Sequence, residues 1–316
     1  MFVRSSHNPI LKPDKKISWR SLKVYNPAVL FENKKYHLFY RAVDQERRSS
    51  IGYGHSKDGV KYILEKQPRL NRNGKLEARG VEDPRLTKIG KEYLLTYTAY
   101  DGDYAKLALA RSQNLIKWHK FGTMLPQWDL FRAGGFSVNW DEARVKDNPK
   151  WCKAGGIFSD KFDGKYLMLF GDSNMWFAEA SDLMHWHTDT KPFIKKRTGF
   201  FDSVHIEMGP PPIKTKHGWF VLYHGVDNNI VYRLGYLLLD LKNPRKIIKR
   251  SEQPIFEPQE PYELTGLIDI AKGRNPKVIF CNGAVLTGDT LKIYYGAADS
   301  VVCTATAPLK EIIDII

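Results

Sequence analysis

The sequence contains little cysteine, and the spacing of its cysteines matches no disulfide or metal-binding motif. Cys152, Cys281 and Cys303 are odd in number and show no CxxC or CxxH spacing. This argues against a disulfide framework and against a structural zinc site, and we expect neither a metal nor an organic cofactor. No window approaches the apolar length of a membrane span, and the N-terminus lacks the apolar core of a secretory signal. We therefore expect a cytoplasmic protein without a membrane partner.

The motifs of several large functional classes are also missing. The phosphate loops GxxxxGK[ST] and GxGxxG, the GxSxG nucleophile elbow and the HExxH metal motif do not occur, which disfavours nucleotide-binding, serine-hydrolase and zinc-protease functions. The net charge of +14 is spread over short basic runs such as Lys195–Arg197, without a nucleic-acid-binding motif. We interpret this charge as a basic, solvated surface and expect no nucleic-acid partner.

What the sequence does have is a repeated strand-like segment rich in Tyr, Leu and Phe. The segment recurs as KYHLFYRA (35–42), EYLLTYTAY (92–100), KYLMLFGD (165–172), GWFVLYHG (218–225) and LKIYYGAAD (291–299). Measured from Tyr36, Tyr93, Tyr166, Trp219 and Lys292, successive copies lie 57, 73, 53 and 73 residues apart. A second strand-like run follows each copy, so the repeating unit is a hairpin, and the spacing suits blades of four strands.

Helix patterns are weak throughout, and 24 Gly and 17 Pro interrupt the chain of 316 residues. This disfavours a doubly wound α/β fold. The hydrophobic fraction of 42% and the charged fraction of 27% are those of a globular protein. We predict an all-β fold, a five-bladed β-propeller that spans residues 1–316 as a single catalytic domain.

A propeller brings the loops at one end of its blades to a common axis, so the site is expected there. Polar residues at equivalent ends of the repeats are Arg41, Tyr97, Asp172, Asn174, Tyr223, His224 and Asp299. For any one of them the alternative is a turn or cap residue. Their shared place in the repeat favours substrate binding.

Two further segments gather charged residues. In EARGVEDPRLT (77–87), Glu82, Asp83 and Arg85 surround a proline. A carboxyl group that is partly desolvated beside another carboxylate has the raised pKa that a general acid needs, whereas the alternative is an Asp-Pro turn with a surface ion pair. In FDSVHIEMGPPPIKT (201–215), Glu207 precedes three prolines that hold the segment extended.

Taken in order, several stretches match a known family. They are NPAVLF (26–31), FYRA (39–42), SSIGYGHSKDGVKY (49–62), GVEDPRLT (80–87), LLTYTAYDG (94–102), GPPPIKTKHGWFVLYHGV (209–226), PYELTG (261–266) and YYGAAD (294–299). Together they resemble glycoside hydrolase family 130, the β-mannoside phosphorylases and β-mannosidases, from the first repeat to the last. The resemblance implies a five-bladed propeller, in agreement with the repeat count.

The resemblance also implies roles for individual residues. Asp83 matches the family's proton donor, which in the phosphorylases is thought to act through a sugar hydroxyl. The residues that match sugar-binding or site-lining positions are Asn26, Arg41, Tyr223, His224 and Asp299. We add Arg85 of the EDPR motif to the expected substrate-binding set. The expected partner is a β-manno-oligosaccharide, and a homo-oligomer is left open.

The chain departs from the phosphorylases at the places that hold their phosphate ligands. Where those enzymes have an Arg-Asn pair and a His-Arg pair, this sequence has Lys150-Trp151 and Phe170-Gly171, so guanidinium groups suited to phosphate are lost. Glu207 stands where they have glycine. An inverting hydrolase needs a carboxylate base to activate water, so we take Glu207 as the base, with Glu263 as a weaker second candidate.

These departures predict an inverting β-mannosidase that releases mannose from short, β-1,2-linked manno-oligosaccharides. The first alternative is a β-mannoside phosphorylase that uses inorganic phosphate, with phosphate contacts from Lys150, Lys153 or Lys161. The second is a carbohydrate-binding propeller without catalysis.

Overall fold

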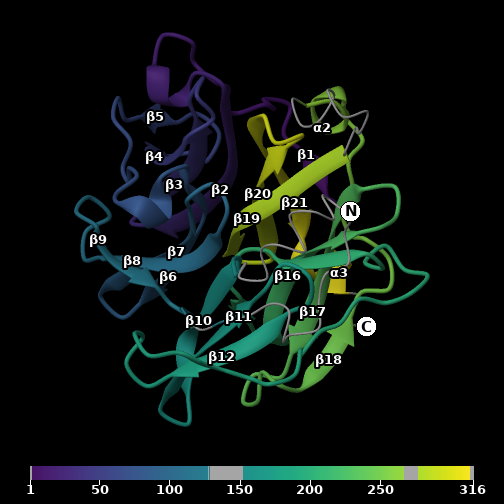
Figure 1. The fold of residues 1–316 in the computed structure, drawn as a ribbon. Helices are drawn as coiled ribbons and strands as arrows, with labels where there is room; N and C mark the ends of the chain where they lie inside the picture. Colours follow the sequence, from purple (N-terminus) through teal and green to yellow (C-terminus); the bar gives the residue numbers. More distant parts are fainter. Residues whose placement is uncertain (1, 127, 129–151, 267–276, 314–316) are drawn as a thin grey trace.

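The protein is built almost entirely from antiparallel strands, as a computed structural model that describes residues 2–126, 128, 152–266 and 277–313 shows (Figure 1). Short helical segments are η1 (Ser18–Arg20), η2 (Lys75–Glu77), α2 (Pro261–Leu264) and α3 (Leu309–Ile313). The prediction of an all-β fold is confirmed.

The strands follow one another in antiparallel groups along the chain. The first group is β2 (Lys23–Glu32), β3 (Lys35–Val43), β4 (Ser49–Ser56) and β5 (Ile63–Leu64). The second is β6 (Gly80–Ile89), β7 (Glu92–Tyr100), β8 (Ala105–Ser112) and β9 (His119–Thr123). A single parallel pairing, between Ser49 and Gly80, links the two.

The later groups repeat this plan. One consists of β10 (Gly155–Phe162), β11 (Lys165–Phe170), β12 (Trp176–Ala180) and β13 (His187–Thr188). The next consists of β14 (His205–Met208), β15 (Ile213–Thr215), β16 (Gly218–Val226), β17 (Val231–Leu239) and β18 (Ile247–Arg250). The last consists of β19 (Lys277–Thr287), β20 (Thr290–Ala297) and β21 (Val301–Pro308), completed by the N-terminal β1 (Val3–Arg4). The strand-like sequence repeats form β3, β7, β11, β16 and β20, and the runs that follow contain β4, β8, β12, β17 and β21.

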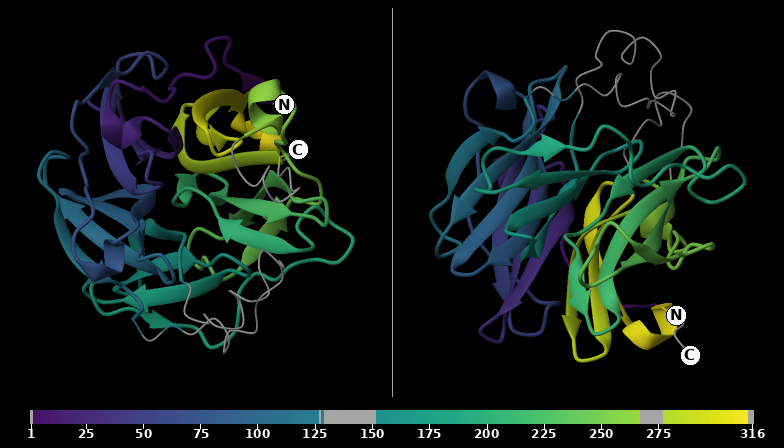
Figure 2. Two further views of the ribbon diagram at one scale, coloured as in Figure 1. Left: turned by 45° about the horizontal axis from the view of Figure 1, so that its top comes forward. Right: turned by 90° about the horizontal axis from the view of Figure 1, so that it is seen from below.

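The groups lie in chain order around a common centre (Figure 2). The first strands of four groups contact one another: β2 contacts β6 and β19, and β6 contacts β10 and β19. Residues that are far apart in the sequence therefore meet where these strands begin. No helix in the described part of the chain combines the length and apolar character needed to cross a membrane.

The hydrophobic core is divided into layers between neighbouring groups. In one layer Phe158 and Phe177 of the β10–β13 group pack with Trp219 of the next group. Another layer joins the first group to the last, with Val24 of β2 packed among residues of β20 and β21. Because strand side chains alternate between the two faces of a sheet, each group buries residues on both faces.

The inner strands β2 and β6 are bent by matching bulges. The strand register shifts between Tyr25 and Ala28 in β2, and between Glu82 and Arg85 in β6. The residues at the bulges, Asn26 and Asp83, have φ angles of 46° and 51°. Asn and Asp tolerate this left-handed region. Each is followed by a proline, which has no backbone N–H group and so loses no hydrogen bond where the bulge interrupts the ladder. The X-Asn/Asp-Pro-X pattern thus folds into a bulge.

Candidate active site

The two bulges bring Asp83 and Asn26 together at the centre of the molecule. The Asp83 carboxyl group is buried. Its Oδ1 accepts hydrogen bonds from Asn26 Nδ2 at 2.8 Å and from Arg41 NH1 at 3.1 Å. No described residue donates a hydrogen bond to its Oδ2. Asp83 is therefore held firmly on one side while its second oxygen is available for a substrate.

Arg41 is fixed by a network around Glu82. Its NH2 lies 2.5 Å from Glu82 Oε1, and Ser49 Oγ donates to the same oxygen at 2.9 Å. The guanidinium also stacks over the Tyr25 ring, at 4.8 Å from the centroid. Burial raises the pKa of Glu82 above its ordinary value although Arg41 counteracts it. Glu82 thus orients the cation that contacts Asp83.

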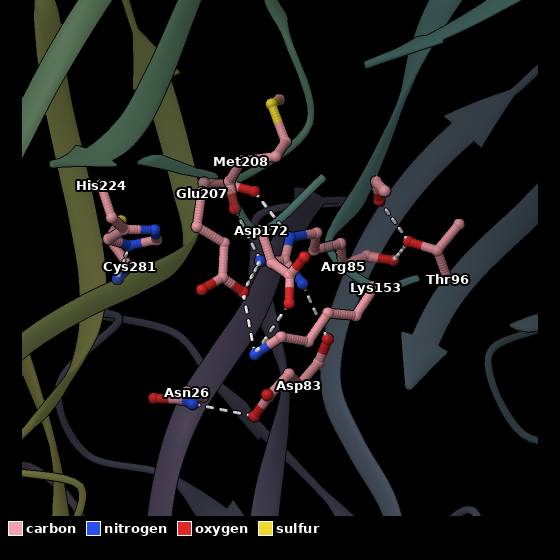
Figure 3. Close-up of polar contacts among 12 residues, drawn as sticks. Asn26, Asp83, Arg85, Thr96, Lys153, Asp172, Glu207, Met208, His224 and Cys281 are labelled. Atoms are coloured by element: carbon pink, nitrogen blue, oxygen red, sulfur yellow. Dashed lines mark hydrogen bonds and ion pairs between the residues drawn. The ribbon is translucent and has the colours of Figure 1, made fainter. Parts of the chain in front are cut away.

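Lys153 lies between the carboxylates of this centre (Figure 3). It precedes β10, and its Nζ is 3.7 Å from Glu207 Oε1 and 3.9 Å from Asp172 Oδ2. Burial opposes its charge, yet Glu207 and Asp172, with Asp83 behind them, raise the pKa of Lys153 above its ordinary value. Its side chain keeps 23% exposure, so it is a charged group that a ligand can reach.

Glu207, on β14, faces Lys153 from the other side of the centre. Its side chain is only 2% exposed. Its Oε2 lies 3.4 Å from His205 Nε2, and its Oε1 has no hydrogen-bond partner. Burial alone would raise the pKa of Glu207, but Lys153, His205 and Arg85 together hold it at about 2. Glu207 is therefore an ionised acceptor at neutral pH.

Arg85 links β6 to the end of β14 through hydrogen bonds to backbone carbonyl groups. Its Nε and NH2 donate to the backbone carbonyls of Gly209 and Met208, at 2.7 and 2.6 Å. Its NH1 donates to the backbone carbonyl of Asp83 at 3.2 Å. The guanidinium is buried and engaged with the backbone, so the structure places this predicted substrate-binding residue behind the site as a brace.

Other predicted residues lie around the same centre. His224, opposite Glu207 in the ladder, stacks on Phe280 with ring centroids 4.0 Å apart, and its Nε2 accepts the Cys281 N–H at 2.8 Å. Burial lowers the pKa of His224 to about 3, so the ring is neutral. Asp299 follows β20 with a φ of 48°. Burial and the nearby Asp83 raise the pKa of Asp299 to about 6, although Lys23 and Arg41 oppose this.

Asp172 and Asn174 follow β11. Asp172 belongs to the centre because its Oδ2 lies 3.9 Å from Lys153 Nζ, and its Oδ1 has no hydrogen-bond partner. Asn174 is buried, and its Oδ1 likewise lacks a partner.

Tyr97, Tyr223 and Glu263 have other contacts. The Tyr97 hydroxyl donates to Glu77 at 2.8 Å, and the Tyr223 hydroxyl donates to Asp202 at 2.8 Å. Glu263 accepts the Tyr295 hydroxyl at 2.7 Å and pairs with Arg4 at 2.8 Å. These are buried tyrosine–carboxylate pairs at equivalent places in different groups, and they do not involve Asp83, Lys153 or Glu207.

Two residues of the centre, Tyr25 and Glu82, were not among the site residues predicted from the sequence. They pair with Arg41 and Thr98 at ladder positions equivalent to the one where Glu207, which was predicted as the base, pairs with His224. Lys153, at the start of β10, entered only as a possible phosphate contact. An alignment of the inner strands, rather than of the more regular second strands, would have brought these residues together.

The cluster combines a buried acid, a reachable cation and several carboxylates, as in a site for a polar substrate. A family model described as beta-1,4-mannooligosaccharide phosphorylase matches residues 4–316. The chain belongs to glycoside hydrolase family 130. A 1,2-beta-oligomannan phosphorylase of Thermoanaerobacter sp. (strain X514) is 36% identical to it over 321 residues, covering 98% of both chains. A beta-1,2-mannobiose phosphorylase of the same organism is 36% identical over 325 residues, again covering 98% of both.

Solved structures agree with this family 130 assignment. One is described with the words "The GH130 family of mannoside phosphorylases contains glycoside hydrolases that target beta-1,2 mannosidic linkages in Candida mannan". It superposes with a TM-score of 0.83 at 29% identity, covering 98% of this chain and 94% of the other.

These family 130 relatives overturn the prediction that the enzyme is a hydrolase. The two relatives at 36% identity over nearly their whole length are both named phosphorylases. The prediction rested on Glu207 in place of a glycine and on missing guanidinium groups at residues 150–151 and 170–171. The first pair lies outside the described residues. At the second, Phe170 is a core residue and Gly171 has no room for a side chain, because a Cβ would lie 2.2 Å from the Asn174 carbonyl oxygen.

The phosphorylase alternative named Lys150, Lys153 and Lys161 as possible phosphate contacts, and of the two that the structure describes the fold brings Lys153 to the site. Lys153 stands in the site, whereas the exposed Lys161 lies over the Tyr166 ring in the β10–β11 hairpin. The absence of arginine at particular sequence positions therefore does not mean that an anion site is absent.

Proposed function

We propose that this chain is an inverting β-mannoside phosphorylase that acts on β-1,2-linked manno-oligosaccharides with inorganic phosphate as the second substrate. The observation that carries the proposal is the placement of the Lys153 ammonium between the acid Asp83 and Glu207 (Figure 3). The linkage follows from the 1,2-beta-oligomannan and beta-1,2-mannobiose phosphorylases that the chain resembles.

The proposed enzyme is one catalytic domain over residues 1–316. Its antiparallel groups are the five blades of a propeller, and the inner strands line the substrate funnel. The ring-like arrangement in Figure 2 and the contacts among the inner strands support this assignment. The mannoside enters where Asn26, Arg41 and Asp299 surround Asp83.

The reaction breaks the bond between C1 of the terminal mannose and the linking oxygen. Asp83 is the proton source for that oxygen, directly or through a sugar hydroxyl, and phosphate forms the new bond to C1 from the opposite face. Lys153 attracts the phosphate and offsets its charge. The products are α-mannose 1-phosphate and a shortened oligosaccharide, and the proton that phosphate loses balances the proton gained by the leaving oxygen.

The test is incubation of the purified protein with β-1,2-mannobiose and β-1,2-mannotriose, with and without phosphate. We expect mannose 1-phosphate only when phosphate is present, with the α configuration by NMR. β-1,4-Mannobiose is the matched control for linkage. Free mannose released at an unchanged rate without phosphate would show a hydrolase, and no turnover of any mannoside would show a binding protein.

A further inference from the structure

Glu207 is an unusual neighbour for a bound phosphate. Its carboxylate is buried and ionised, and its Oε1 has no hydrogen-bond partner although it lies only 3.7 Å from Lys153 Nζ. A buried acceptor without a donor is costly. Because Glu207 Oε1 lacks a donor and faces Lys153, we expect the bound ligand to carry a proton that it can donate to this oxygen.

The charge balance of the site leads to the same expectation. Among the described residues, the carboxyl groups of the centre outnumber its lysine and arginine side chains. The carboxyl groups are Glu82, Asp83, Asp172, Glu207 and Asp299, and the cations are Arg41, Arg85, Lys153 and, near Asp299, Lys23. Arg85 is already engaged with backbone carbonyls. A fully deprotonated anion placed beside Lys153 would face Glu207 with no proton between two negative oxygens, which is repulsive.

We propose that Glu207 selects a phosphate ion that carries a proton, by accepting a hydrogen bond from the P–OH group, and thereby excludes sulfate. The proposal rests on the proposed function. At neutral pH inorganic phosphate and arsenate keep at least one proton, whereas sulfate keeps none. The three anions have the same tetrahedral shape, so Lys153 alone does not distinguish them.

The ionisation of Glu207 fits this role. A protonated Glu207 would donate to any anion and would bind sulfate as readily as phosphate. With Lys153, His205 and Arg85 around it, the carboxylate stays charged and accepts only. Hydrogen bonds to charged groups are about twice as strong as neutral ones, so the discrimination is expected to be large.

The experiment measures competition in the phosphorolysis of β-1,2-mannobiose at neutral pH. For the wild type we expect the Ki of sulfate to exceed the KM of phosphate by at least about tenfold. Arsenate, which keeps a proton, should replace phosphate as the attacking anion. A wild-type ratio near one overturns the proposal, whatever the variants do.

Two variants separate the hydrogen bond from the charge. Glu207→Gln and Asp172→Asn each remove one negative charge beside Lys153. We expect Glu207→Gln to reduce the ratio of sulfate Ki to phosphate KM by about tenfold, because its amide donates to sulfate, and Asp172→Asn to retain most of it. An equal loss in both variants would show a general charge effect and overturn the proposal. If the wild type forms no mannose 1-phosphate, the proposed function itself fails; if it does but binds sulfate equally well, only this inference fails.

Discussion

The backbone conformation of Asp83 determines where its carboxyl group lies. The bulge at Asp83-Pro84 places its carboxyl group against Asn26 and Arg41, which both donate to Oδ1. The same carboxyl group in a regular strand would point to one face of the sheet and would not meet residues of β2. The left-handed backbone is thus the means by which β6 presents its acid at the centre.

The first prediction concerns this acid. Asp83→Asn preserves the acceptor at Oδ1 and tolerates the φ of 51°, but its amide is no proton source for the leaving group. We expect phosphorolysis to fall by about a hundredfold to ten-thousandfold, measured as mannose 1-phosphate formation. The thermal unfolding midpoint should stay close to that of the wild type. An Asp83→Asn enzyme with near-normal turnover would remove Asp83 from the proposed mechanism.

At the scale of strands, the second strand of several groups carries, near its end, a tyrosine that donates a hydrogen bond to a buried carboxylate. Tyr97 binds Glu77, Tyr223 binds Asp202 and Tyr295 binds Glu263. Each carboxylate also contacts cations, which are Lys120 for Glu77, Arg197 and Arg250 for Asp202, and Arg4 for Glu263. Each carboxylate comes from a segment outside the strand pair, so the tyrosine anchors a connecting segment to the sheet.

The second prediction tests this structural role. Tyr97→Phe and Tyr223→Phe remove one hydroxyl each and leave a buried carboxylate with one donor fewer. We expect each variant to lose about 1 to 2 kcal/mol in the free energy of unfolding, measured by chemical denaturation, while the KM for the mannoside is unchanged. A raised KM without loss of stability would instead support a substrate contact.

The tyrosines also show where sequence reasoning reaches its limit. The regular second strands made the repeat visible, and the all-β class followed from it. Tyr97 and Tyr223 share their place in the repeat because they share a structural role, which the pattern alone could not separate from substrate binding. Glu207 lies on the short inner strand β14, and Lys153 lies in the segment before β10, where the repeat is not visible in the sequence, so their proximity emerges only in three dimensions.

For the whole molecule, the contact between the two ends of the chain completes the ring. Val3 and Arg4 pair with Thr306 and Ala305 of β21, and the backbone of Leu11 forms a bridge with Val302. The layer between the first and last groups is hydrophobic like the others. Loosening this contact is therefore expected to lower the stability of the fold.

The last prediction concerns the ion pair between Arg4 of β1 and Glu263 of α2. Arg4 donates to both oxygens of the fully buried Glu263, at 2.8 Å each. Burial alone would raise the pKa of Glu263, but hydrogen bonds from Arg4, the Gln259 and Glu260 N–H groups and Tyr295 hold it below its ordinary value. A lowered pKa stabilises the fold above the ordinary value for glutamate, and this contribution is lost as the pH falls through the folded-state pKa.

Arg4→Met removes the main cation and leaves the carboxylate buried. We expect a loss of about 3 kcal/mol in the free energy of unfolding at pH 7. Near pH 3 the difference from the wild type should be smaller, because the variant's Glu263 lacks the hydrogen bonds from Arg4 that lower its pKa and can become neutral by protonation. Arg245→Met is the matched control: its partners Asp189 and Glu179 are about a third exposed, so its loss should be at most about 1 kcal/mol. Denaturation curves at both pH values decide the matter. An Arg4→Met effect that is no larger than that of Arg245→Met, or that is independent of pH, would mean that the ring is closed by its apolar layer alone.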